Sequence, residues 1–431
     1  MADAIPAERT CYLYQDFQRY YDAVDDAAIQ RGLEAGEGLV TALMKDKAGY
    51  RFLEKDEQLR RAAATHAVYD EFIERLKPDV VLFPDVEAVN GFILLNICQS
   101  RGIEVLYTVA QRFLGRSFFA PNPYETLPRW YGTYAEQDIH AARHVIRRFR
   151  ERKSSFSDLG QRYPMPPKPS LFYRVVINGW NRWRRERLHI SEETVIVRVR
   201  RNMRHFANWM RGVWFDLAAT RFFDRLGPEQ LPMKYVFYAF HMTPESSING
   251  LEPYYVDQFR VVDALLLNLP VGSRLVVKEH PSMRGFRPLA FYRALRRKPG
   301  LILLHPEVDS RRLVEGATLV ATVSGTVGLE SYLLGKPCVM FGRAFFGHLC
   351  AHPPEITRMR PYLEQIIASY VPASEAEIEF ELAKFLHIAG EFEIPNPYHF
   401  PETLAPHRIK AARDLLKRYL VHLPGEVRPA A

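Results

Sequence analysis

The spacing of hydrophobic positions changes repeatedly along the chain between that of a helix and that of a strand. Apolar residues recur at helical spacing over 17–31, 71–76 and 92–99, and short apolar runs typical of buried strands cover 11–14, 80–83 and 103–108. Turn residues separate these segments, as at Lys77-Pro78-Asp79. This order of helix, turn and strand predicts an α/β domain with a doubly wound sheet.

The same rhythm returns after residue 234. The predicted strands are 235–240, 275–278, 301–304, 319–322 and 338–341, and the predicted helices are 254–267, 286–295, 310–315, 327–334 and 409–420. Between 131 and 222 the rhythm is absent, and a strongly basic helix at 140–153 leads into a proline-rich stretch. We therefore expect two α/β domains facing a cleft, over 1–230 (with a helical insertion at 131–222) and 231–400, followed by a C-terminal helix and tail over 401–431.

Composition narrows the class of protein. The chain has 431 residues, of which 47% are hydrophobic and 13% aromatic, and this excludes a disordered chain. Its net charge of +8 permits anionic partners without selecting one. The four cysteines lie far apart and form no CxxC pair, so we expect neither a zinc site nor a disulfide framework. The first ten residues lack a signal-peptide core and no run reaches the about 18–20 apolar residues of a membrane span, so we expect a cytoplasmic protein.

The first segment that packing alone does not explain is Lys278-Glu279-His280-Pro281, at the end of a predicted strand. Ligands of parallel α/β sheets bind at the carboxyl ends of strands, and this tetrad falls at such an end. The simpler alternatives are an ordinary loop for His280-Pro281 and a solvated surface position for Lys278. Alternation along the strand turns Glu279 away from its two neighbours, which favours a structural role for it.

The second segment is Ser324-Gly325-Thr326-Val327-Gly328-Leu329-Glu330, which directly follows another predicted strand. Gly325 allows close backbone approach, two hydroxyl groups flank it, and the helix that begins here directs free N–H groups at the loop, an arrangement that suits a phosphate. Glu330, one turn into the helix, could accept hydrogen bonds from a ribose diol, and His280 could donate to the phosphate oxygens. The alternative for the loop is a plain helix N-cap.

These motifs, together with Gly335-Lys336-Pro337, resemble those of the capsule polysaccharide biosynthesis family, which includes retaining Kdo transferases. The loop Phe240-His241-Met242-Thr243-Pro244-Glu245-Ser246-Ser247 is similar to that family's strand-end loop with a Pro-Glu step, and 302–310 resembles a further family segment. The resemblance covers residues 235 to about 347, and the N-terminal half is similar in rhythm only.

The resemblance implies a GT-B fold, in which two Rossmann-type domains face a cleft, and a nucleotide-sugar donor, usually a CMP-activated ulosonic acid such as CMP-Kdo. It implies that His280, Ser324 and Thr326 hold the donor phosphate and that Glu330 holds the ribose. The full set of expected donor-binding residues is Lys278, His280, Pro281, Ser324, Gly325, Thr326, Gly328, Glu330, His241 and Glu245. The family works without a bound metal ion, so we expect no cofactor beyond the nucleotide-sugar substrate. The expected partner is a glycan or lipid-linked glycan acceptor.

The catalytic carboxylate is where the sequence departs from the family. Family transferases carry an acidic motif after an N-terminal strand, whereas the corresponding segment 109–116 holds no carboxylate. The candidates are therefore Asp85 and Glu87 at the next strand end, with Asp16 a weaker one, and Asp85 could equally be a helix N-cap. Arg112 and Arg116 could bind the carboxylate of an acidic sugar or acceptor.

The basic and aromatic middle of the chain, which contains Trp180, Trp183 and Trp209, leaves several interpretations open. Solvated helix faces explain most such runs; no recognised module supports nucleic-acid binding, and peripheral docking on anionic lipid is the better functional use. The hypothesis from the sequence is a metal-independent glycosyltransferase of capsular or surface polysaccharide synthesis. The alternatives are a sugar-nucleotide epimerase of the same architecture and a non-catalytic assembly or export protein.

Overall fold

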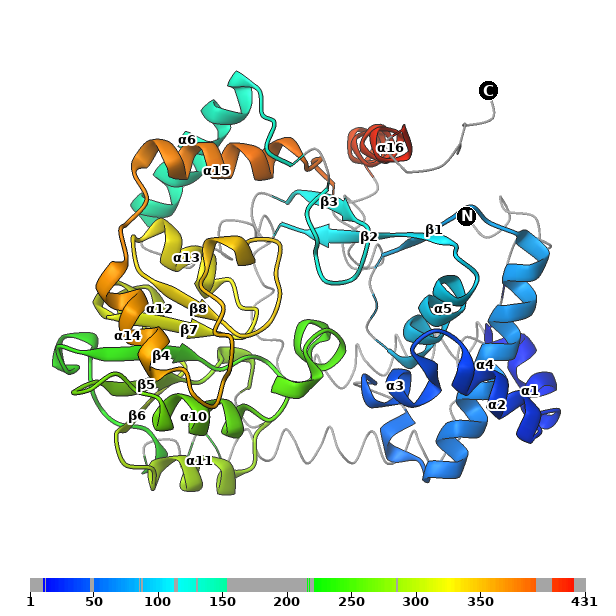
Figure 1. Cartoon of the computed structure of the whole chain (residues 1–431), viewed down its shortest axis with the longest axis horizontal. Coiled ribbons are helices and arrows are strands. Elements are labelled where there is room, and N and C mark those ends of the chain that lie inside the picture. Colours follow the sequence, from blue (N-terminus) through cyan, green and yellow to red (C-terminus); the bar gives the residue numbers. More distant parts are fainter. Residues whose placement is uncertain are drawn as a thin grey trace. The chain divides into compact units, whose positions relative to one another are not determined.

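The computed structural model describes residues 11, 13–46, 50–84, 86, 88–111, 115–128, 131–152, 215, 217, 221–283, 286–392 and 405–421. These residues divide into two compact units, each of which is described by itself (Figure 1). Of the residues that the structure describes, those up to 81 and those within 88–105 form the first unit, and those within 82–86, within 106–152 and from 215 onward form the second. The predicted boundaries at 230 and 400 stay a prediction.

Helices dominate the first unit, and its N-terminus differs from the expectation. The helices are α1 (Leu13–Asp22), α2 (Asp26–Glu34), α3 (Gly38–Met44), α4 (Lys55–Leu76) and α5 (Val89–Ser100). The apolar run at 11–14 leads into α1 instead of forming a strand. The single helix predicted over 17–31 is two helices, because Asp25 accepts a hydrogen bond from the N–H of Ala28 at 2.7 Å and so begins α2 as its N-cap.

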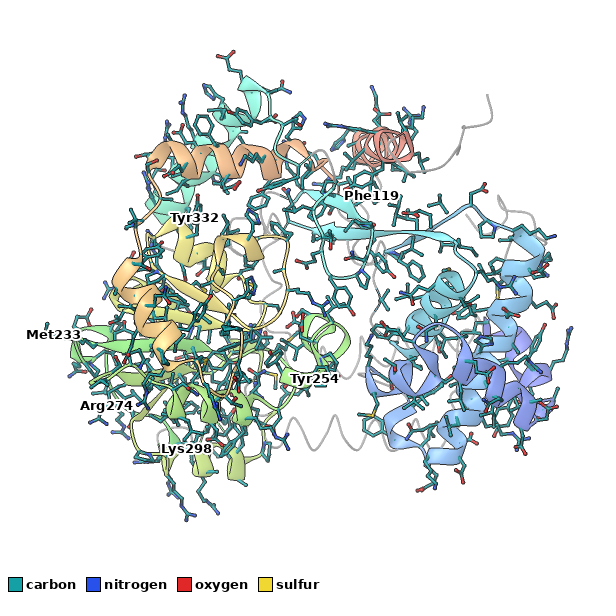
Figure 2. The ribbon with its side chains drawn as sticks, viewed as in Figure 1. Phe119, Met233, Tyr254, Arg274, Lys298 and Tyr332 are labelled. Carbon is teal, nitrogen blue, oxygen red and sulfur yellow. The ribbon has the colours of Figure 1, made fainter. Side chains whose placement is uncertain are left out.

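A small sheet contains β1 (Val80–Phe83), β2 (Glu104–Ala110) and β3 (Ser117–Ala120) in that order. The first two strands were predicted, whereas β3 was not, and it pairs antiparallel with β2. Within the described residues this sheet therefore differs from the doubly wound sheet expected for the N-terminal half. On β3, Phe119 contacts Tyr419 of α16 (Pro406–Val421) edge to face, with ring centres 5.5 Å apart (Figure 2).

The second unit is built on a five-stranded parallel sheet. Its strands are β4 (Tyr235–Ala239), β5 (Arg274–Lys278), β6 (Leu301–Leu304), β7 (Leu319–Thr322) and β8 (Cys338–Met340), in the order β6-β5-β4-β7-β8. All four pairings are parallel, as in Val236 opposite Leu275 and Val236 opposite Leu319. The predicted strands are confirmed, and the α/β class is consistent with a GT-B-like fold. The order reverses between β4 and β7, which is the topological switch point of such a sheet.

Helices cover both faces of this sheet, because alternate strand residues point to opposite sides. Val236 and Tyr238 of β4 share one buried core with side chains of α10 (Gln258–Leu267), α11 (Leu289–Arg296) and α14 (Arg360–Ser369). On the other side the hydroxyl of Tyr235 donates to the carbonyl of Leu313 in α12 (Ser310–Gly316) at 2.8 Å. Helix α13 (Val327–Leu333) contacts both β7 and β8. The sheet is thus doubly wound.

The predicted basic helix is present as α6 (Glu136–Arg152), and it packs along α15 (Glu375–His387), an acidic helix that we did not predict (Figure 1). Arg143 and Arg150 pair with Glu379 and Glu375 at 2.9 and 2.8 Å. Part of the positive charge expected for lipid docking therefore faces acidic side chains. The remainder of the basic middle, including the three tryptophans, lies outside the described residues. Among the helices that are described, none has the length and apolar character needed to cross a membrane.

Candidate functional site

The chemistry-bearing residues of the second unit gather at the carboxyl edge of its parallel sheet. Because all five strands run the same way, the loops after β4, β5 and β7 leave from that one edge. His241 follows β4, the tetrad 278–281 ends β5, and the loop 323–326 joins β7 to α13. The sequence placed these segments at strand ends, and the strand order brings the first and last of them to the switch point.

His241 connects the two strands of the switch point. Its side chain is buried, and its Nε2 accepts a hydrogen bond from the backbone N–H of Val323 at 3.1 Å. The hydroxyl of Thr322 lies 3.2 Å from the same nitrogen and accepts from the N–H of Gly325 at 3.0 Å. Since Nε2 accepts from an N–H, it carries no proton, and the neutral ring holds its proton on Nδ1. His241 therefore fixes the backbone of the loop after β7.

Gly325 has a packing role that the sequence did not reveal. A Cβ at this position would lie 2.9 Å from Oγ1 of Thr322, which is closer than real Cβ atoms come, and 3.0 Å from Cε1 of His241, which is tighter than most real Cβ contacts. The sequence suggested that Gly325 lets a ligand approach the backbone closely. In the structure the side chains of Thr322 and His241 occupy the space in which a Cβ of Gly325 would lie. Thr322 was not among the predicted site residues, because a buried strand residue gives no sequence signal of its own.

Lys278 reaches from the end of β5 toward the first turn of α12. Its ammonium group donates to Oγ of Ser310 at 2.6 Å. Burial lowers the pKa of Lys278, and the nearby carboxylates of Asp309 and Glu330 oppose that change. Glu330 is itself buried, in the first turn of α13. The structure therefore brings Lys278 close enough to Glu330 for their charges to interact, as a shared binding site requires.

His280 has a defined tautomer. Its Nδ1 accepts a hydrogen bond from the N–H of Ser282 at 3.1 Å, so in the neutral ring the proton sits on Nε2 and can be donated. Burial lowers its pKa below the ordinary value of 6.5, and the charges of Lys278 and Arg287 lower it further. A neutral His280 that donates through Nε2 is suited to a phosphate or hydroxyl oxygen.

Glu279 lies on the opposite side of the strand end and is structural in its contacts. Its carboxylate accepts from Arg287 Nε at 2.9 Å, from the Tyr292 hydroxyl at 2.6 Å and from the N–H of His280 at 2.7 Å. Burial raises its pKa, and the charge of Arg287 acts against that rise. Arg287 also donates to the carbonyl of His241 at 2.7 Å, so it links the loops after β4 and β5. Sequence reasoning missed Arg287, which lies in a loop without a motif.

The remaining expected donor-binding residues occupy mixed surroundings. Ser324 is buried and Thr326 is the N-cap residue of α13, although its side chain makes no capping hydrogen bond. A Cβ on Gly328 would lie 3.1 Å from Sγ of Cys350, so this glycine serves the packing of α13 on the loop after β8. Pro281 begins a short 3₁₀ turn, Pro281–Met283, and Glu245 precedes a π-helical turn, Ser246–Gly250. A cis peptide bond joins Thr243 to Pro244.

The structure describes few of the residues predicted for catalysis or acceptor binding. Asp85, Glu87 and Arg112 lie outside the described residues. Asp16 was expected to follow a strand, but it lies within the helix α1. Arg116 donates to the carbonyl of Leu386 and pairs with Glu391, both at 3.3 Å, so its guanidinium is engaged by the end of α15 and the residues after it.

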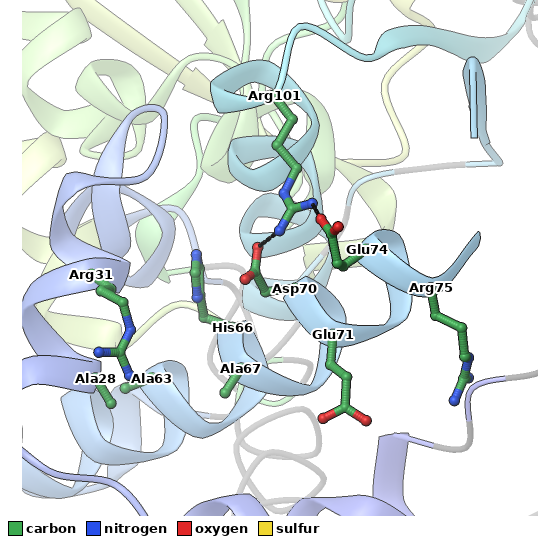
Figure 3. A pocket seen from close by; sticks show the side chains of 10 residues that line it. All are labelled: Ala28, Arg31, Ala63, His66, Ala67, Asp70, Glu71, Glu74, Arg75 and Arg101. Carbon is green, nitrogen blue, oxygen red and sulfur yellow. Dashed lines mark hydrogen bonds and ion pairs between the residues drawn. The ribbon is translucent and has the colours of Figure 1, made fainter. Parts of the chain in front are cut away.

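A cavity of about 400 Å³ in the first unit is lined by α2, α4 and Arg101 (Figure 3). Arg101 lies between Asp70 and Glu74, which it contacts at 2.7 and 2.5 Å. Asp70 and Glu74 belong to α4, and Arg101 is the C-cap residue of α5, so these two ion pairs join the two helices. The guanidinium–carboxylate cluster is accordingly assigned to packing between α4 and the end of α5.

One known protein family is similar to the segment of the chain that contains the candidate site. Residues 257–349 match the model of a protein family described as capsule polysaccharide biosynthesis protein. The matched segment runs from α10 to the loop after β8, and it includes Lys278, His280 and the loop 323–326. The resemblance seen in the sequence is therefore confirmed over this segment. No curated protein matches the chain.

Several solved structures are similar to this chain at a low level. KpsC, β-Kdo 2,4 transferase, from Thermosulfurimonas dismutans is 14% identical with a TM-score of 0.36, covering 70% of this chain and 86% of that one. KpsC, β-Kdo 2,7 transferase, from the same organism is 11% identical with a TM-score of 0.37, covering 74% and 79%. The UDP-GlcNAc 2-epimerase of Methanocaldococcus jannaschii is 12% identical with a TM-score of 0.28, covering 76% and 80%.

Proposed function

Because residues 257–349 match capsule polysaccharide biosynthesis proteins, we propose that this chain is a glycosyltransferase of capsular or surface polysaccharide synthesis. Its donor is a nucleotide-activated sugar, CMP-Kdo or a related CMP-sugar, and its acceptor is a glycan or lipid-linked glycan. The observation that carries the proposal is the meeting of Lys278, His280 and the loop 323–326 at the carboxyl edge of one parallel sheet that contains the matched segment.

In the proposed complex the donor phosphate lies against the loop 323–326. His280 donates to the phosphate through Nε2, which carries the one ring N–H proton of the neutral imidazole. Ser324 and Thr326, which belong to the loop, contribute their hydroxyl groups. Lys278 supplies positive charge beside the phosphate, and Glu330 accepts from the ribose hydroxyl groups. His241 acts on the donor through the loop that it holds, as a positioning residue.

These residues can replace a metal ion in offsetting the charge that leaves with the nucleotide. Hydrogen-bond donors fixed in advance stabilise developing negative charge without reorganising, and such groups are worth several kcal/mol to a transition state. Lys278 is fixed by Ser310 and the loop 323–325 by His241, so both elements are in place before a ligand arrives. Metal-independent transfer is therefore part of the proposal.

The proposal is tested by calorimetric titration of the full chain with CMP and with UDP. We expect saturable CMP binding by the wild type, and a loss of at least tenfold in affinity for His280→Ala, which removes one charge-assisted hydrogen bond. His407→Ala, an exposed histidine of α16, is the matched control and should bind like the wild type. Equal CMP binding by wild type and His280→Ala would overturn the assignment of the site. A new sugar nucleotide formed from donor alone, without acceptor, would indicate an epimerase instead.

A further inference from the structure

The cavity of the first unit lies against one face of the helix α4 (Figure 3). The α4 residues on its wall follow helical spacing, in which every third or fourth residue shares a face, and they include Ala63, His66, Ala67, Asp70, Glu71 and Glu74. Ala28 of α2 also lines it. Because these alanine side chains are short, a space of about 400 Å³ is left between the helices, which is within the size range of small-ligand pockets.

His66 presents an unpaired polar atom to this cavity. Its side chain is 9% exposed, and its Nε2 is buried without a hydrogen-bond partner. Such an atom costs free energy, and nearly all buried polar groups of native structures are paired. Burial lowers the pKa of His66 below 6.5, with the charge of Asp70 opposing this change and those of Arg31 and Arg101 adding to it. The ring is therefore neutral at pH 7 and can carry its one N–H proton on Nε2, ready to donate to a ligand.

Arg31 brings a positive charge to the same wall. Its side chain comes from α2, is exposed, and makes no hydrogen bond or ion pair with another residue that the structure describes. Arg101 differs from it, because the guanidinium of Arg101 is held between Asp70 and Glu74. Arg31 can thus pair with a negative group of a ligand without giving up a contact within the protein.

Three carboxylates line the cavity, and each already has a positive partner. Asp70 and Glu74 pair with Arg101 at 2.7 and 2.5 Å, and Glu71 lies 3.4 Å from the guanidinium of Arg19. A carboxylate has about four lone-pair positions, so each of these groups can still accept a hydrogen bond from a hydroxyl group. The same carboxylates repel a ligand that carries more than one negative charge.

We propose that this cavity binds a sugar acid, a ligand with a single carboxylate and several hydroxyl groups. The ligand carboxylate accepts two hydrogen bonds from the planar guanidinium of Arg31 and a third from Nε2 of His66. Its hydroxyl groups donate to the carboxylates of α4. A single negative charge balances that of Arg31, whereas a phosphate dianion would add a second charge beside three carboxylates. The inference is independent of the proposed donor site, whose residues belong to the other unit.

Calorimetric titration of the full chain with glucuronate at constant ionic strength tests the site. We expect saturable binding of glucuronate and no binding of glucose, which has the hydroxyl groups but no carboxylate. Inorganic phosphate should bind about tenfold more weakly or less. Arg31→Gln should weaken glucuronate binding about tenfold or more, because a charged pair of hydrogen bonds is lost. The matched control is Arg60→Gln, an exposed arginine of α4 outside the cavity wall, which should bind like the wild type.

A second variant, His66→Leu, separates ligand binding from a structural role. It removes Nε2, and the adjoining cavity leaves room for the branched side chain. We expect glucuronate binding weakened about fivefold or more, and a melting temperature without ligand that is no lower than that of the wild type, because no buried polar atom is left unpaired. A disaccharide with a terminal glucuronate that binds as tightly as the monosaccharide would assign the site to the end of a glycan, and weaker binding would assign it to the free acid.

Several results would overturn the proposal. They are equal glucuronate binding by the wild type and Arg31→Gln, equal binding of glucose and glucuronate, tighter binding of phosphate than of glucuronate, and a lower melting temperature of His66→Leu without ligand. A chain that binds glucuronate but not CMP would overturn the donor assignment alone. A chain that binds CMP but not glucuronate would overturn the sugar-acid site alone.

Discussion

Nε2 of His241 accepts the backbone N–H of Val323 at 3.1 Å, and this bond joins the loops that follow β4 and β7. Those strands are neighbours at the point where the sheet order reverses, so the bond spans the place at which doubly wound sheets bind their ligands. The loop 323–325 owes its conformation to a side chain that lies 82 residues earlier. The shape of the proposed phosphate site is therefore set from outside its own motif.

Replacing His241 should weaken nucleotide binding without a direct ligand contact being lost. His241→Ala leaves the N–H of Val323 buried without its acceptor, which costs about 1–3 kcal/mol and frees the loop. We expect a lower melting temperature and CMP affinity reduced about tenfold or more by calorimetry. An unchanged affinity in a folded variant would show that the loop holds its conformation without His241.

Adding one methyl group at Gly325 should have a similar effect through steric overlap. In Gly325→Ala the new Cβ meets both Thr322 and His241, and overpacking of this kind costs about 1–3 kcal/mol. The double variant His241→Ala with Gly325→Ala removes one of the two clashing groups, so the two losses should be less than additive. Additive losses in urea unfolding would contradict the contact between these positions.

Among the ion pairs of the described residues, the buried pair Glu279–Arg287 should contribute more to the free energy of unfolding than any exposed pair does. Glu279→Gln leaves the buried Arg287 uncompensated, and we expect a loss of about 3 kcal/mol in the free energy of unfolding. Arg260→Ala, which breaks an exposed pair with Asp257, is the matched control and should change it by less than about 0.5 kcal/mol. Chemical denaturation measures both, and equal effects would contradict the prediction.

Acid should destabilise the protein in part through Glu381. Its pKa of about 2 in the folded chain lies below the ordinary value of 4.5, so its contribution to stability is complete above pH 4.5 and is lost as the pH falls toward 2. Because solvent screens this partly buried carboxylate, Glu381→Gln should lower stability at neutral pH by about 1–2 kcal/mol, less than the full pKa shift implies, and flatten the pH dependence over that window. Unfolding curves collected from pH 2 to 7 provide the measurement, and parallel curves for the two proteins would refute it.

The sequence by itself determined the α/β class and most strands of the second unit. Leu301–Leu304 and Leu319–Thr322 were predicted with their observed bounds, because a short apolar run between turn residues specifies a buried parallel strand locally. It also placed Lys278, His280 and the loop 323–326 at strand ends, and parallel strands necessarily present such ends at one edge. Where local signals compete the prediction was wrong, as at 11–14, where an apolar run continues into the helix α1.

Only the tertiary structure decided which side chains meet at that edge. Arg287 reaches both Glu279 and the carbonyl of His241, and Glu381 reaches His348, through contacts that depend on strand order and helix packing. The role of Gly325 changed for the same reason, since the atoms that require a glycine belong to Thr322 and to the distant His241. Local periodicity encodes where each element begins and which face it buries. Local periodicity does not encode which distant element covers that face, because the choice of that element depends on the free energy of packing the whole unit.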